Sequence, residues 1–123
     1  MPSRERVEAL ISMVEAGKFV EAIEAFYAED ATMQENQQAP RGPRANLIDG
    51  ERKTLAAHRE ARTLPGSTYV LEGDRVVIRW TFEFTRKDGK RWQLEELALQ
   101  RWRGERIVEE RFFYDREQLR RFT

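Results

Sequence analysis

The chain has 123 residues, the size of a single domain, and 40% of them are hydrophobic, which suffices for one core. Its 22 Lys and Arg residues balance 22 Asp and Glu residues, so neither a nucleic acid nor a membrane surface is an expected partner. There are no cysteines, which excludes disulfides, thiol nucleophiles and cysteine-ligated metals. The N-terminal segment has no apolar stretch typical of a secretory signal, so we expect a cytoplasmic protein with one domain over residues 1–123.

Two short amphipathic helices are predicted at the start of the chain. Apolar side chains recur at helical spacing over residues 7–14 and again over residues 19–27. The Ser3 hydroxyl can accept a hydrogen bond from a free amide group of the first turn, and Gly17 can end the first helix in the left-handed conformation. We therefore expect a helical hairpin joined at Gly17.

A long loop and a third helix are predicted next. Residues 34–48 contain two prolines, a glycine and several amides, which favour a loop that could form a lid or a rim. Asp49 can cap a helix over residues 50–62, which has a thin apolar face and carries the only histidine, His58.

The second half of the chain is predicted to form a meander of β-strands. Apolar residues alternate with polar ones, which indicates strands with one buried face. The pattern predicts long strands over residues 75–86, 91–102 and 105–114, joined by tight turns that contain glycine. This order predicts an α+β fold in which three N-terminal helices pack on a curved antiparallel sheet and form a cone. The mouth of such a cone can bind a small apolar molecule.

Two segments carry a resemblance to a known family. FYAEDAT over residues 26–32 and GERIVEERFFYD over residues 104–115 resemble the SnoaL-like domain of the nuclear transport factor two superfamily, which has the polyketide cyclase and ketosteroid isomerase-like fold. The resemblance covers roughly residues 7–122. It implies a cystatin-like, SnoaL-like roll without a cofactor, and a homodimer formed through the sheet. The superfamily includes cyclases, isomerases, hydrolases, dehydratases and non-catalytic proteins, so the resemblance does not fix the activity.

Comparison with two activities of the superfamily gives a mixed result. The catalytic carboxylate that follows the DDAT segment of ketosteroid isomerases falls on Glu35. The two oxyanion donors of those enzymes fall on Leu10 and near Ala98, which cannot donate, so the resemblance argues against ketosteroid isomerase activity. In the cyclases an acid follows the last strand, and Asp115 occupies a comparable place, but their assisting histidine has no match here.

Three glutamates are the main candidate catalytic residues. Inside an apolar cone, desolvation would raise the pKa of Glu35 until it acted as a general base near neutral pH; the alternative is an exposed acid before a loop. If the aromatic side chains at the strand ends point inward, alternation places Glu96 and Glu110 inward as well, as a possible acid–base couple. A register shifted by one residue would instead bury Glu95 and Glu109 beside arginines.

Aromatic residues are the expected ligand contacts. We expect Trp80, Trp102, Phe112 and Phe26 to face the ligand, although most aromatic side chains in such a fold form the core. His58 could shuttle a proton or simply pack beside them. A single histidine and the lack of cysteine argue against a metal site.

The sequence therefore predicts a cofactor-independent protein that binds a small, mainly apolar organic molecule. Any catalysis would be acid–base isomerisation, cyclisation or hydration, with Glu35 as the base and an inward glutamate, assisted by the Tyr114 hydroxyl, as the donor. Asp115 is a second candidate base. Two alternatives stay open: a non-catalytic carrier with the same cone, and a dimeric interaction module whose cone is filled by its own side chains.

Overall fold

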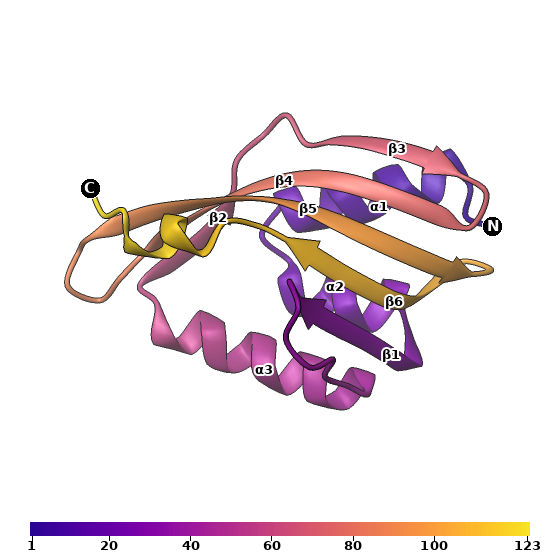
Figure 1. The fold of residues 1–123 in the computed structure, drawn as a ribbon, viewed down its shortest axis with the longest axis horizontal. Helices are drawn as coiled ribbons and strands as arrows, with labels where there is room; N and C mark the ends of the chain where they lie inside the picture. The colour runs from indigo at the N-terminus through magenta and orange to yellow at the C-terminus, as the bar shows by residue number, and fades with distance from the viewer.

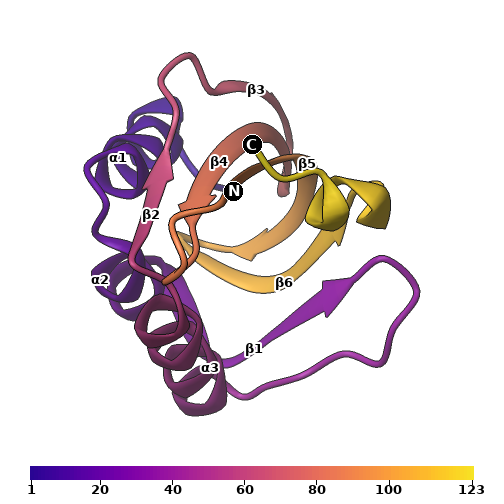
Figure 2. The same cartoon turned by 90° about the vertical axis from the view of Figure 1, so that its left-hand side faces the viewer.

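The computed structural model describes residues 1–123 as a curled sheet with helices stacked along one side (Figure 1). In the view along the strands, the sheet wraps around the interior and the three helices close the open side (Figure 2). The elements in chain order are α1 (Arg4–Glu15), α2 (Phe19–Phe26), β1 (Tyr27–Glu35), α3 (Arg44–Ala57), β2 (Glu60–Thr63), β3 (Thr68–Glu72), β4 (Arg75–Thr85), β5 (Arg91–Arg103), β6 (Arg106–Phe113) and the 3₁₀ helix η1 (Arg116–Arg120).

The strands form one mixed sheet in the order β1-β6-β5-β4-β2, with β3 also paired to β4. Strands β4, β5 and β6 form the predicted antiparallel meander. Strand β1 adds to the edge of β6 in parallel, so the sheet is not purely antiparallel. The α+β prediction of three helices on a curved sheet is confirmed. The parallel pair joins the first strand to the last and places the end of β1 beside the interior of the roll.

The predicted helix ends are confirmed in the first hairpin. The Ser3 hydroxyl accepts a hydrogen bond from the Arg6 amide nitrogen at 3.1 Å, which satisfies one free donor of the first turn of α1. Gly17 has a φ of 81°, the left-handed conformation that an L side chain rarely adopts. The chain can therefore reverse within the three residues between α1 and α2.

The third helix differs from its prediction at both ends. It begins at Arg44 after an extended Pro43, whose missing N–H would have had no partner in the first turn. The predicted cap, Asp49, lies inside the helix and pairs with Lys53 at 3.0 Å. Residues 60–62, predicted to be helical, form part of β2, because their backbone pairs with β4. Pairing with a neighbouring strand outweighs a weak helical pattern.

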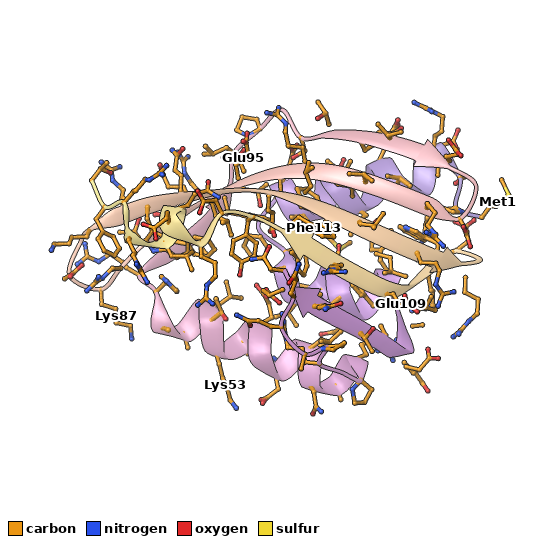
Figure 3. All side chains as sticks on the ribbon, viewed as in Figure 1. Met1, Lys53, Lys87, Glu95, Glu109 and Phe113 are labelled. Carbon is orange, nitrogen blue, oxygen red and sulfur yellow. The ribbon has the colours of Figure 1, made fainter.

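The hydrophobic core lies between the helices and the concave face of the sheet. Helix α1 contributes Val7 and Leu10, and the sheet contributes Ile78, Trp102 and Ile107, all almost completely inaccessible to solvent. The opposite sheet face carries the other residues of each alternating pair, among them the Glu95, Glu109 and Phe113 labelled in Figure 3. No helix of this structure combines the length and the apolar character that crossing a membrane requires.

A matched pair of valines tests this division into faces. Val76 on β4 is 0% exposed, whereas Val70 on β3 is 68% exposed. We expect Val76→Ala to lower the free energy of unfolding by roughly 2–3 kcal/mol, because two buried methyl groups are lost and a cavity remains. Val70→Ala should change it by less than about 0.5 kcal/mol. Chemical denaturation of both variants measures the difference, and equal effects would contradict the assignment of faces.

Candidate active site

A cavity of about 220 Å³ lies between the concave face of the sheet and the helices. Thirteen of its 21 lining residues are hydrophobic, so the wall is mainly apolar. Its aromatic part consists of Phe19, Tyr27, Trp80, Phe82, Phe84 and Phe112. Its polar part consists of Glu35, Arg41, Glu51, Thr54, Arg62, Glu96, Gln100 and Glu110. The pocket therefore combines an apolar interior with four carboxyl groups that reach it from β1, α3, β5 and β6.

Glu96 is the least satisfied of these carboxyl groups. It faces inward from the middle of β5, directly across from Trp80 on β4, and its residue is only 7% exposed. Its carboxyl group has no hydrogen-bond partner and no ion pair in the protein. Desolvation, followed by the charges of Glu110, Glu35 and Glu51, raises its pKa from 4.5 to about 8. Glu96 therefore holds a proton at neutral pH while facing the cavity.

Glu110 is the most firmly held carboxyl group. It is 3% exposed and lies on β6, where the Tyr27 hydroxyl donates to its Oε1 atom and Gln100 Nε2 donates to its Oε2 atom at 2.7 Å. Trp102 Nε1 donates to Gln100 Oε1 at 3.0 Å. An indole can only donate, so this bond fixes the Gln100 amide with its NH₂ group toward Glu110. Desolvation outweighs the two donors and raises the pKa of Glu110 to about 7.

The other two carboxyl groups lie at the end of β1 and on α3. Glu35 forms an ion pair with Arg41, and its side chain is 25% exposed, which places it at the mouth of the cavity. Glu51 forms no ion pair. Desolvation raises its pKa, opposed by the charge of Arg41 and reinforced by that of Glu35. The mouth therefore presents an ion pair and an acid that lacks a partner of its own.

Of the two strand registers that the sequence allows, the structure has the one that turns Glu96 and Glu110 inward. Glu96 and Glu110 are buried, while Glu95 and Glu109 lie on the outer face and pair with arginines. The Arg79–Glu95 and Arg101–Glu109 distances are 3.2 Å and 2.6 Å. The predicted Glu35 also lines the cavity, as do the predicted ligand contacts Trp80 and Phe112. Their part in catalysis or binding stays a prediction.

Five other predicted site residues lie off the cavity wall. Phe26 and Trp102 are buried in the core, with the Arg6 guanidinium 3.9 Å from the Phe26 ring centre. His58 ends α3, bonds through Nδ1 to the Thr54 carbonyl at 2.8 Å and packs beside Phe84 and Trp92. The remaining two residues, Tyr114 and Asp115, follow β6.

The two residues after β6 also have local partners. The Asp115 side chain is exposed and caps η1 by accepting from the Glu117 amide nitrogen. The amide nitrogen of Tyr114 donates to the Asn36 side chain at 3.0 Å. Desolvation, with the charges of Glu35 and Glu96, raises the pKa of Tyr114, so its hydroxyl lies within their electrostatic reach. Asp115 therefore caps η1 away from the cavity wall, and its part as a second base stays a prediction.

Gln100, Tyr27 and Glu51 are among the wall residues that sequence reasoning missed. Gln100 shares the inward face of β5 with Glu96, so the alternation could have identified it. Tyr27 continues the apolar spacing of the second predicted helix, although in the structure it begins β1. No sequence pattern marks Glu51 as a wall residue, because only the packing of α3 against the sheet edge turns it toward the cavity. No group of three or more His, Asp or Glu side chains is arranged to hold a metal ion.

Comparison with known proteins identifies the family. The model of the SnoaL-like domain matches residues 7–110, most of the chain. The chain belongs to the SnoaL-like domain family. No protein with a curated description matches this SnoaL-like sequence.

Solved structures share the fold of this SnoaL-like domain at low sequence identity. A protein from Pseudomonas putida, provisionally named a polyketide cyclase, is 18% identical with a TM-score of 0.81, and the match covers 97% of this chain and 96% of that one. A provisionally named SnoaL-like polyketide cyclase from Mesorhizobium loti is 21% identical with a TM-score of 0.75, over 93% and 100% of the chains. A Catenulispora acidiphila protein with the ketosteroid isomerase-like fold, solved with trimethylamine, is 21% identical with a TM-score of 0.76, over 94% and 89%.

The raised pKa of Glu96 should make stability depend on pH. The folded protein binds a proton at Glu96 that the unfolded chain has lost, over the interval from about pH 4.5 to about pH 8. The contribution of Glu96 to the free energy of unfolding therefore falls as the pH rises through this interval. Glu96→Gln removes this ionisation. Between about pH 5 and about pH 8 the wild type should therefore lose on the order of 3 kcal/mol of unfolding free energy that the variant does not lose.

Denaturant unfolding at several pH values measures this difference. Glu95→Gln, one residue away on the outer face, is the matched control and should follow the wild type at every pH. A difference between Glu96→Gln and wild type that stayed constant from about pH 5 to about pH 8 would contradict the proposed protonation state.

Proposed function

We propose that this SnoaL-like protein binds a small, mainly apolar organic molecule and transfers a proton on it by acid–base chemistry. In this proposal Glu96 donates a proton to a heteroatom of the ligand, and Glu35 accepts a proton at the mouth of the pocket. The observation that carries the proposal is the Glu96 carboxyl group, which is buried, without a partner and directed at an apolar cavity.

The size and lining of the cavity limit the ligand. An apolar cavity of about 150 Å³ holds a benzene molecule, so the 220 Å³ found here suits a single ring with a short substituent. The rings of Trp80 and Phe82 lie 5.8 Å apart and present a flat apolar wall to it. Such a cavity leaves little room for an extended polar substrate.

Two acids with different surroundings support a donor and an acceptor. Glu96 lacks any donor that would stabilise its charged form, so it retains its proton. Glu35 pairs with the Arg41 guanidinium at the mouth of the pocket, where a carboxylate can accept a proton from a ligand. Carboxylates placed in this way suffice for isomerisation, cyclisation or hydration, and the proposed chemistry requires no cofactor.

A non-catalytic carrier with the same pocket is the second candidate. The aromatic wall would bind the same class of ligand without any proton transfer. The third candidate, an assembly module with a filled cone, is disfavoured by the cavity, which the side chains of the protein leave open.

Deuterium exchange separates the enzyme from the carrier. Small ring ketones such as cyclohexanone exchange the protons next to their carbonyl group when a base removes them, and NMR in heavy water follows the rate. We expect Glu35→Gln and Glu96→Gln to slow the exchange catalysed by the protein by about 100-fold or more.

Binding of the ketone to the wild type and to the same variants is followed through tryptophan fluorescence, because Trp80 lines the pocket. Glu109→Gln, on the outer face, is the control and should leave both exchange and binding unchanged. Ketone binding without catalysed exchange in the wild type would support the carrier, and an absence of binding would contradict the proposed function.

A homodimer formed through the outer face of the sheet is also proposed. Leu97 and Phe113 are exposed and sit opposite each other on β5 and β6, and Val77 and Leu99 form the next pair along the same face. Apolar patches on a sheet suit a second copy related by two-fold symmetry, and a net charge of zero gives little repulsion between copies.

An arginine placed in this patch tests the dimer. We expect Leu97→Arg to convert the dimer to a monomer, because the charge would be buried against its own copy without a partner. Sedimentation velocity measures the mass. Glu60→Arg on the edge strand β2 is the control and should leave the dimer intact, and a wild type that sediments as a monomer would contradict the proposal.

A further inference from the structure

We propose that the ligand of this pocket carries a basic nitrogen, which takes up a proton and is held as an ammonium ion against the acidic wall. This inference rests on the proposed function, because it assumes that the cavity is the binding site, and it adds the chemical class of the ligand. An amine of single-ring size is the expected form.

The charges on the wall are unequally matched. Four carboxyl groups and two guanidinium groups line the cavity, and both guanidinium groups already have partners. Arg41 pairs with Glu35, and Arg62 donates from Nε to Glu83 at 3.0 Å. The other three lining acids, Glu51, Glu96 and Glu110, therefore face the cavity without a cation of their own.

Glu96 supplies the specific position for the nitrogen. The residue is only 7% exposed, and its carboxyl group has no hydrogen-bond partner in the protein. The group is directed into the cavity rather than into the core. A ligand that donates a hydrogen bond at this point would complete it.

The proton balance favours an amine over a neutral donor. A simple amine has a pKa near 10, well above that of Glu96, so the Glu96 proton moves to the nitrogen and leaves a carboxylate beside an ammonium ion. If the amine enters already protonated, Glu96 releases its own proton to water instead. Either route ends in the same charge-assisted hydrogen bond, which is stronger than a neutral one.

The apolar wall is compatible with this charge. Trp80 lies across the strand pair from Glu96, and its ring stacks near Phe82 at 5.8 Å. The face of an aromatic ring attracts a cation, tryptophan most strongly. An anionic ligand would gain no attraction from the ring face, and any of Glu51, Glu96 and Glu110 that is ionised would repel it.

Three ligands of nearly equal size test the inference. Phenethylamine, phenethyl alcohol and phenylacetate share one ring and a short chain but end in a cation, a neutral group and an anion. At about pH 7 we expect the amine to bind at least about tenfold more tightly than the alcohol, and phenylacetate to bind most weakly. Isothermal titration calorimetry gives the three affinities.

Two further measurements, on glutamine variants and on proton release, test whether Glu96 causes the preference for the amine. Glu96→Gln should remove the preference for the amine and keep the affinity for the alcohol, whereas Glu95→Gln should retain the preference. Titrations at about pH 7 in buffers with different ionisation enthalpies should show about one proton released for each ammonium ion bound, and none for the alcohol.

The outcomes distinguish the two proposals. Equal affinity for the amine and the alcohol would overturn this inference and leave the pocket as a binding site for neutral molecules. A preference for the amine that persisted in Glu96→Gln would also overturn it, because the nitrogen would then lie elsewhere. A failure of all three ligands to bind would overturn the proposed function together with the inference.

Discussion

The cost of enclosing carboxyl groups in an apolar cavity governs the chemistry of this protein. Water would stabilise the charges of Glu96 and Glu110, and the curled sheet removes that water. Each group can respond by keeping its proton or by gaining donors from the protein. Glu110 gains donors from Tyr27 and Gln100, while Glu96 has none. The same burial therefore yields two acids with different properties within one pocket.

The fold supplies this arrangement through simple geometry. Alternation along β5 sends Glu96, Ala98, Gln100 and Trp102 to the concave face at intervals of two residues. Cross-strand pairing then places Glu110 beside Gln100, and the parallel strand β1 brings Glu35 to the same rim. Three helices complete the enclosure. The residues that carry charge come from distant parts of the chain, while the residues that hold them in place are ordinary core and sheet positions.

Much of the fold could be predicted because it depends on local patterns. Helical spacing before residue 27 and strict alternation after residue 75 each reflect which side chains avoid water. The third helix was misplaced because its apolar face is thin and offers little periodic signal, with Leu47 as its only buried residue. The helical assignment of residues 60–62 failed because backbone pairing with β4 outweighs a weak local preference. The parallel position of β1 depends on its pairing with β6, a strand distant in sequence, and no local pattern encodes that pairing.

The sequence by itself determined that one glutamate of each doubled pair must face the interior, because side chains on a strand alternate between its two faces whatever the register. Only the tertiary structure decided that Glu96 and Glu110 are the inward pair, that Gln100 and Tyr27 stabilise one of them, and that Glu51 joins them from α3. The tertiary structure also decided the position of Asp115, which the sequence offered as a second candidate base and which is an exposed cap of η1. The physical reason is that the properties of a carboxyl group depend on the solvent and the donors around it, and in a folded chain these come from residues remote in sequence.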